Sequence, residues 1–149
     1  MSDSLIVKTL RRIARQHDGY LRPRDVVDAA REKMSPLHDR FEWDDSLASE
    51  QYRLWQARTL IRVTVAYEPV GNGEEMAFRV FTSLVSDRQP AGGYRVTAKV
   101  MADPELREEL LTDALAEMRR FQEKYRHLKE LAEVFAAMSE VQERVGKRA

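Results

Sequence analysis

Residues 35–65 read SPLHDRFEWDDSLASEQYRLWQARTLIRVTV, and this stretch decides the fold. A proline turn and an acidic segment precede a run in which hydrophobic residues recur at helical spacing. Counted at about 100° per residue, they fall on two separate sides of one helix. A helix with two apolar sides is usually covered from both, so we expect residues 46–62 to form a central helix that Asp44, Asp45 or Ser46 caps. The two sides are Leu47, Leu54, Ala57 and Ile61, and Ala48, Tyr52, Trp55 and Val63.

Two shorter helices are predicted before the central one, over residues 4–17 and 23–33. Gly19 suits the left-handed conformation that ends many helices, and Pro23 suits the first position of the next. After residue 62 the period changes to alternation on both sides of a Gly-Asn-Gly turn, which predicts an antiparallel β-hairpin over residues 63–85. Residues 94–96 predict a short third strand followed by a turn, although Thr97 also suits a helical turn through Met101.

The C-terminal third contains the clearest helix start in the chain, Asp103-Pro104-Glu105. Hydrophobic residues then recur in steps of three and four from Leu111 to Phe135, as in a heptad seam. A helix of about 40 residues would run roughly 60 Å. It therefore either breaks near residues 125–128, or projects, or pairs with a second chain. The residues predicted to mediate self-association are Met118, Phe121, Tyr125, Leu128 and Phe135.

These patterns together predict an α+β, mostly helical protein. Residues 1–101 form a helical unit with a β-hairpin, and residues 102–149 form a long helical segment that packs on it or self-associates. The side chains predicted to be largely buried are Leu10, Ile13, Val27, Phe41, Trp43, Leu54, Trp55, Ile61, Val65, Phe78, Val80 and Phe121.

Composition excludes several classes of protein. The 149 residues are 43% hydrophobic and 34% charged, with no cysteine and no apolar run long enough to span a membrane. The first residues lack the pattern of a secretory signal. The formal net charge of zero argues against a dedicated nucleic-acid binder, whose affinity comes largely from phosphate neutralisation. Basic residues are nevertheless concentrated within the first 24 positions, which predicts a local basic surface.

No catalytic motif is present, and we predict no cofactor and no metal. His38 lies among acidic residues that could complete a metal site with it, but the sequence has none of the spacings that such sites use, and a helix-capping loop explains it better. His17 and His127 are isolated, and the segment GNGEE at residues 71–75 lacks the glycine spacing of a phosphate loop. The acidic neighbours of His38 are Asp39, Glu42, Asp44 and Asp45.

Five arginines are the candidate contacts to nucleic acid. Three lie on the central helix, and two flank the start of the helix before it. The alternative for the first three is a structural role, in ion pairs with nearby acids or with their stems over apolar surface. The five candidates are Arg53, Arg58, Arg62, Arg22 and Arg24.

The predicted order of helix, extended link, helix, loop, helix and hairpin resembles a winged helix-turn-helix. Glu74 and Glu75 make the tip of the wing acidic, whereas a wing that touches DNA is usually basic. The segments SPLHDRFEWDD, YRLWQARTLIRV, GYRV, ADPELREELL and KYRHLKEL resemble a group of small bacteriophage and prophage proteins of uncharacterised function. The resemblance implies a phage origin and a place in the bacterial cytoplasm, and no activity.

The expected function is therefore that of a non-enzymatic phage accessory or regulatory protein acting through duplex DNA or a DNA-bound partner. The alternative is a protein-interaction or assembly module that works through the C-terminal helix, as a homodimer or with a phage or host protein. Neither a membrane nor a small-molecule substrate is expected as a partner.

Overall fold

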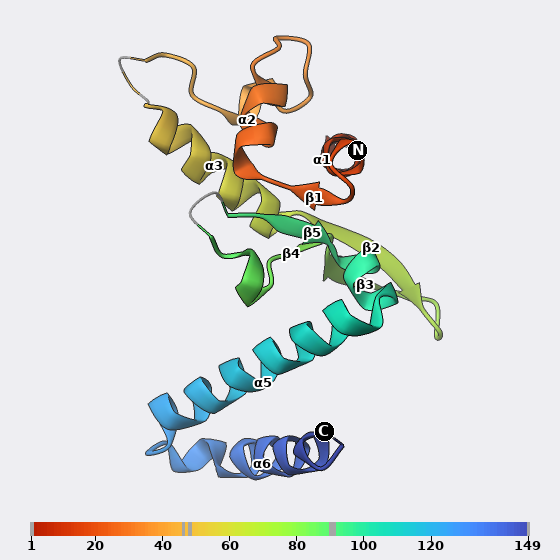
Figure 1. The fold of residues 1–149 in the computed structure, drawn as a ribbon, viewed down its shortest axis with the longest axis vertical. Helices are drawn as coiled ribbons and strands as arrows, with labels where there is room; N and C mark the ends of the chain where they lie inside the picture. Colours follow the sequence, from red (N-terminus) through yellow and green to blue (C-terminus); the bar gives the residue numbers. More distant parts are fainter. Residues whose placement is uncertain (1, 46, 48, 90–91, 149) are drawn as a thin grey trace. The chain divides into compact units, whose positions relative to one another are not determined.

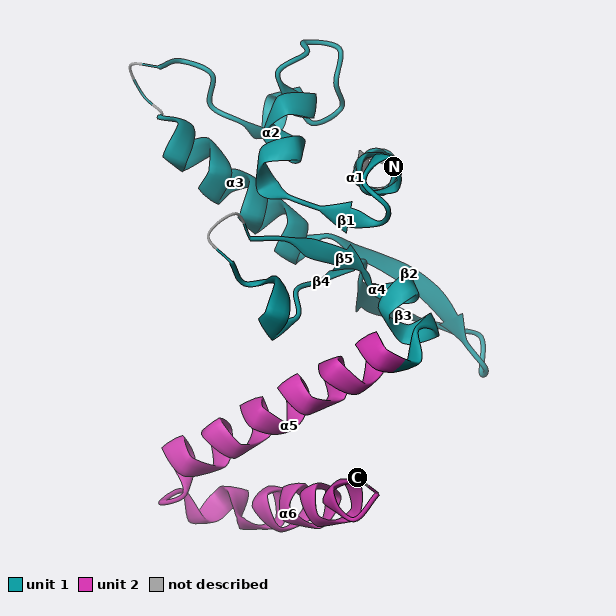
Figure 2. Cartoon of the chain, in the orientation of Figure 1, with its two compact units in different colours: residues 1–104 teal, residues 105–149 magenta. Residues whose placement is uncertain are grey.

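The computed structural model describes residues 2–45, 47, 49–89 and 92–148. The chain has the predicted α+β, mostly helical fold, with a small amount of antiparallel sheet. It divides into two compact units, residues 1–104 and 105–149 (Figure 2). The division falls three residues beyond the predicted boundary at residue 101, after the proline that opens the C-terminal helix.

Three α-helices form the N-terminal part of unit 1: α1 (Ser2–Gln16), α2 (Pro23–Ala30) and α3 (Glu50–Val63) (Figure 1). A 3-10 helix, η1 (His38–Arg40), lies in the loop between α2 and α3. The N-cap of α3 is Ser49, so neither Asp44 nor Asp45 caps the helix; Ser46, the third candidate, is outside the described residues. Leu47 precedes the helix, so the apolar sides predicted for α3 begin only with Tyr52 and Leu54.

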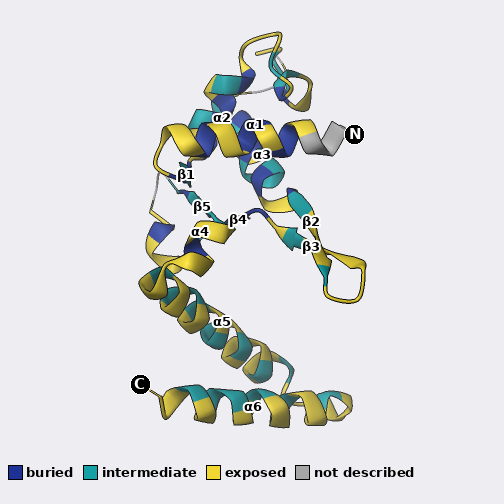
Figure 3. Ribbon diagram, turned by 90° about the vertical axis from the view of Figure 1, so that its right-hand side faces the viewer, coloured by how far each residue is buried: buried dark blue, intermediate teal, exposed yellow. Residues whose placement is uncertain are grey.

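The core of unit 1 lies between these helices. Each contributes one apolar stripe of buried residues, and Figure 3 colours the buried parts of the ribbon dark blue. Alanine and valine on α2 let its neighbours approach closely, and each large side chain removed from water stabilises the fold by about 1.5–3 kcal/mol. The central members are Leu10, Ile13 and Ala14 of α1, Val26, Val27 and Ala30 of α2, and Ala57 and Ile61 of α3.

Two antiparallel sheets complete unit 1. The predicted hairpin is formed by β2 (Val65–Val70) and β3 (Glu74–Arg79), paired in register from Val65 with Arg79 to Val70 with Glu74. A second sheet has the order β1 (Tyr20–Leu21), β5 (Tyr94–Val96) and β4 (Phe81–Thr82). A short helix, α4 (Thr97–Ala102), follows β5 where we favoured a turn.

The element order α1, β1, α2, α3, β2, β3 agrees with the order predicted for a winged helix. The strand pairing adds one feature: β1 pairs with β5, a strand that follows the hairpin. β5 also pairs with β4. It therefore connects β1, which links α1 to α2, with β4, which follows the hairpin.

An ion pair between a buried acid and a half-buried base holds Arg95, the middle residue of β5. The Asp87 carboxylate, 4% exposed, accepts hydrogen bonds from Arg95 Nη2 and Nε at 2.8 and 2.9 Å. The guanidinium lies over the ring of Tyr20, 5.4 Å from its centroid. Burial, and secondarily the charge of Asp87, raises the pKa of the Tyr20 phenol. The pair ties the 3-10 turn η2 (Val85–Asp87) to β5, a connection that no local pattern predicts.

The predicted core is correct in part. Trp55 and Phe121 are 54% and 39% exposed, so their predicted burial is wrong. For Trp55 the reason is that α3 is covered on one side, where Ala57 and Ile61 meet the core, and not on both. The buried members of the predicted set are Leu10, Ile13, Val27, Phe41, Ile61 and Val80. The half-buried members are Trp43, Leu54, Val65 and Phe78.

Unit 2 contains α5 (Pro104–Tyr125), a 3-10 turn η3 (Lys129–Leu131) and α6 (Ala132–Gly146). The helix therefore breaks after Tyr125, which was one of the predicted alternatives. Gln122 links the two helices, because its Nε2 donates to Phe135 O at 2.9 Å and its Oε1 accepts from Gln142 Nε2 at 3.0 Å. None of the described residues from 105 to 148 is buried.

The fold predicts a specific intolerance at Gly93. A Cβ atom there would lie 2.0 Å from Cζ of Tyr20, whose ring rests on the glycine. Gly93→Ala should therefore lower the free energy of unfolding by about 1–3 kcal/mol, the usual cost of overpacking. Urea denaturation measures the change. Gly71→Ala is the control, because a Cβ at Gly71 would meet nothing within 4 Å. Equal effects of the two substitutions would contradict this packing.

Candidate interaction surfaces

The loop between α2 and α3 is organised around the indole ring of Trp43. Its Nε1 donates a hydrogen bond to His38 O at 2.9 Å, and the His38 ring stacks on it at 5.2 Å between centroids. His38 Nδ1 in turn lies 2.9 Å from Ala30 O, and Phe41 tilts against the indole at 5.7 Å. His38 is thus a packing residue of this loop. Among the described residues no group of three or more potential ligands is placed to hold a metal ion.

Arg53 belongs to the same cluster. Arg53 is only 5% exposed. Its Nε donates a hydrogen bond to Glu42 O at 3.0 Å, and its guanidinium lies 5.4 Å from the centroid of the Trp43 ring. The pKa of Arg53 is raised, and the largest cause is the hydrogen bond that its Nη2 donates to the Asp45 carboxylate. Arg53 therefore joins α3 to the loop before it. These contacts are those of the structural alternative predicted for Arg53, and its contact to DNA stays a prediction.

The other four predicted arginines differ in their availability. Arg22 donates two hydrogen bonds to Asp25, at 2.8 and 3.0 Å. The pKa of Arg22 is raised, and hydrogen bonding to Asp25 is the largest cause. Arg24 and Arg62 are exposed, and Arg58 is half-buried on α3. Arg24, Arg58 and Arg62 remain candidates for binding an anion, but they lie on two different helices.

A basic stripe on α1 was not included among the predicted site residues. Its members recur at positions i, i+3, i+4 and i+7, so they share one helix face, and all are exposed. The signal was present in the sequence as the charge bias of the first 24 residues. The stripe consists of Lys8, Arg11, Arg12 and Arg15.

The outer side of α3 carries an exposed aromatic pair, Tyr52 and Trp55. Their rings stack at 5.7 Å between centroids with an interplanar angle of 17°, and the residues are 45% and 54% exposed. The spacing of three residues places both on one helix face. Exposed aromatic rings combine a large apolar area with a polar tip, a combination enriched at protein interfaces.

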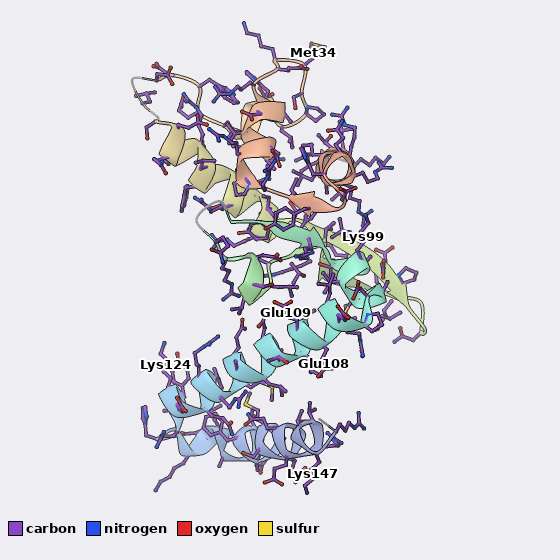
Figure 4. The ribbon with its side chains drawn as sticks, viewed as in Figure 1. Met34, Lys99, Glu108, Glu109, Lys124 and Lys147 are labelled. Carbon is purple, nitrogen blue, oxygen red and sulfur yellow. The ribbon has the colours of Figure 1, made fainter. Side chains whose placement is uncertain are left out.

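Part of the predicted self-association seam is used inside unit 2. Phe121 packs against Tyr125 and Phe135, at 5.0 and 6.0 Å between ring centroids. Met118 is half-buried on α5, and Leu128 is 38% exposed in the connection between the helices. Figure 4 shows charged side chains along the unit, including Glu108 on α5 and Lys147 beyond α6. An incomplete apolar seam therefore remains on a helix pair in which no described residue is buried.

Comparison of the chain with protein-family models, with curated proteins and with solved structures gives no match. Within the described residues, no helix combines the length and the apolar character that crossing a bilayer requires. The function is therefore inferred from the surfaces of the chain itself.

The geometry of Arg53 predicts unequal effects for two arginines on one helix. Arg53→Ala should lower the melting temperature by several degrees, because Glu42 O, Asp45 and the Trp43 ring all lose a partner. Arg58→Ala, on the half-buried flank of the same helix, should change it little. Thermal unfolding followed by circular dichroism gives both values. Similar melting temperatures for the two variants would show that the Trp43 cluster does not depend on Arg53.

Self-association through unit 2 stays a prediction, and light scattering of the intact protein tests it. At tens of micromolar we expect a dimer, which Leu111→Glu combined with Leu128→Glu dissociates. Both are exposed seam positions outside the Phe121 contacts, and each large apolar side chain contributes about 1.5–3 kcal/mol when covered. Arg120→Glu, an exposed position on the opposite face of α5 from Leu111, is the control. A monomeric intact chain would rule out the homodimer.

Proposed function

We propose that the protein is a non-enzymatic accessory or regulatory protein of phage or prophage type that works by binding. Unit 1 is the binding module, and the outer side of α3 contacts a protein partner. The observation that carries this proposal is the stacked, exposed pair of Tyr52 and Trp55. In a winged-helix order of elements, α3 is also the helix expected to meet a target.

Energetics favour a protein over duplex DNA as the target of α3. A partner that covers both rings removes two large apolar surfaces from water, and aromatic residues are frequent hot spots of protein interfaces. Phosphate binding instead needs several exposed cations on one face. Arg53 is buried in the Trp43 cluster, which leaves Arg58 and Arg62. The acidic wing tip at Glu74 and Glu75 would repel a phosphate backbone.

Duplex DNA is the second candidate, and the basic stripe of α1 favours it. Four exposed cations lie between positions 8 and 15, a span of roughly 10 Å along the helix. Charges this close act together within one Debye length, about 8–10 Å at physiological salt. The neutral charge of the whole chain therefore does not remove local attraction to phosphates. If duplex DNA is the target, α1 makes the contacts to phosphates that were predicted for α3.

Site-specific photocrosslinking tests the role of α3. Benzoylphenylalanine in place of Trp55, in the full-length chain in its native bacterial host, should give one discrete crosslinked protein. The same group in place of Met34, which is 93% exposed at the loop after α2 (Figure 4), is the control and should not give that product. Tyr52→Glu in the position-55 chain should abolish it, because the partner loses half of the aromatic pair.

Identical crosslinking patterns at positions 55 and 34 would contradict a site on α3. Anisotropy of labelled duplex DNA, at about 50 and 200 mM salt, distinguishes the second candidate. Binding that weakens steeply with salt, and falls at least about tenfold in Arg12→Glu combined with Arg15→Glu, would establish DNA as the target. Duplex binding absent at low salt would remove that candidate and leave the protein partner.

A further inference from the structure

A groove of about 460 Å³ opens in unit 1 between α1, the end of α3 and β2. It is separate from Tyr52 and Trp55, which do not line it. Its volume lies within the range of ligand-binding clefts. The floor is apolar, with Ile6 and Val7 from α1, Leu60 and Val63 from α3, and Val65 and Tyr67 from β2. Val63 and Tyr67 are both 64% exposed, so the groove is open to a ligand.

The charged residues that line the groove all have the same sign. Lys8 and Arg11 of α1 and Arg40 of η1 contribute three exposed cations, and no aspartate or glutamate is among the lining residues that the structure describes. Three cations over an apolar floor attract a ligand that has both carboxylates and hydrophobic groups. Charge complementarity therefore defines the chemistry of the occupant.

The backbone of β2 defines the conformation of the occupant. In the described part of the chain, β2 pairs on one side only, with β3. Val80 N donates to Thr64 O at 3.3 Å, so Thr64 and Val80 are a hydrogen-bonded pair. Such pairs alternate along an antiparallel ladder. The N–H and C=O groups of Val65 and Tyr67 therefore point away from β3, towards the open edge that lines the groove.

Pro69 limits how far this edge extends. It is the next residue whose backbone faces outward, and it has no N–H to donate. Proline on an edge strand is a common device against uncontrolled pairing. The edge thus accepts a short segment that pairs with Val65 and Tyr67 and ends near Pro69.

We propose that the groove binds a short, extended, acidic segment of a protein partner, which adds as a strand to the free edge of β2. The backbone of the segment pairs with Val65 and Tyr67. Its side chains alternate, as in any strand, so that hydrophobic groups enter the apolar floor while carboxylates meet Lys8, Arg11 and Arg40. This site goes beyond the contact proposed for Tyr52 and Trp55, and either can exist without the other.

A short fluorescein-labelled peptide in which valine and glutamate alternate is the probe, and fluorescence anisotropy with the full-length protein is the measurement. We expect saturable binding that falls at least about tenfold in Lys8→Glu combined with Arg11→Glu. The matched control is Arg119→Glu combined with Arg120→Glu, which makes a change of charge of the same size on exposed residues of α5, outside the basic stripe of α1 and the residues that line the groove. It should keep the affinity within about twofold.

Two further peptides separate the contributions. Replacing every glutamate by lysine should abolish binding, because the rim of the groove is cationic. Methylating alternate backbone nitrogens should also abolish binding by removing the donors that pair with β2. Slower hydrogen exchange at the amides of Val65 and Tyr67 in the complex would locate the added strand.

Three results would overturn the proposal. The first is no saturable binding of the glutamate peptide; if laurate binds in the groove instead, the groove is assigned to an anionic lipid. The second is that the lysine or the methylated peptide binds as tightly as the glutamate peptide. The third is an equal loss of affinity in the two charge-reversed proteins. Circular dichroism of both charge-reversed proteins verifies that they are folded. None of these outcomes depends on Trp55, so the role proposed for α3 is tested separately.

Discussion

The contact between Arg53 and the Trp43 ring is the constraint on which the arrangement of α2, α3 and their loop depends. Arg53 reaches from α3 to Glu42 O and Asp45, while Arg31, next to the end of α2, pairs with Glu50 at 2.8 Å. The loop is thereby attached to α3, and α3 is attached to the end of α2. These contacts draw the first charged residues of α3 toward the loop. The outer side of the helix is left with an aromatic pair, and that side is the one proposed to meet a partner.

Because capping and turn chemistry are local, periodicity predicted the first three helices of unit 1 and the hairpin, but not α4. It could not predict which of the two apolar sides of α3 is covered. Both sides have hydrophobic residues, and only the position of α2 and α1 distinguishes Ile61, which is buried, from Trp55, which is exposed. The break of the C-terminal helix after Tyr125 was likewise left open, since neither glycine nor proline marks it.

The binding surfaces were harder to predict than the fold. Arg53 and Arg58 are the same residue type on one helix, and only the position of Trp43 and Glu42 O makes the first of them structural. The groove joins α1 to β2, segments about 60 residues apart in the sequence, so no local motif could reveal it. The partners Asp87 and Arg95 are only eight residues apart, but no periodic pattern connects them, because the acid lies in the 3-10 turn η2 and the base on β5.

The formal net charge of zero describes the whole chain and not its surfaces. Charges act over about one Debye length, so a partner is selected by the few that lie near its contact. A DNA duplex presents phosphates over tens of ångströms and needs many cations, whereas a short acidic strand needs two or three together with apolar area and free backbone groups. Lys8, Arg11 and Arg40 beside the open edge of β2 supply this second combination within one groove. A chain of balanced charge can in this way bind an anionic segment strongly while it attracts long polyanions only weakly.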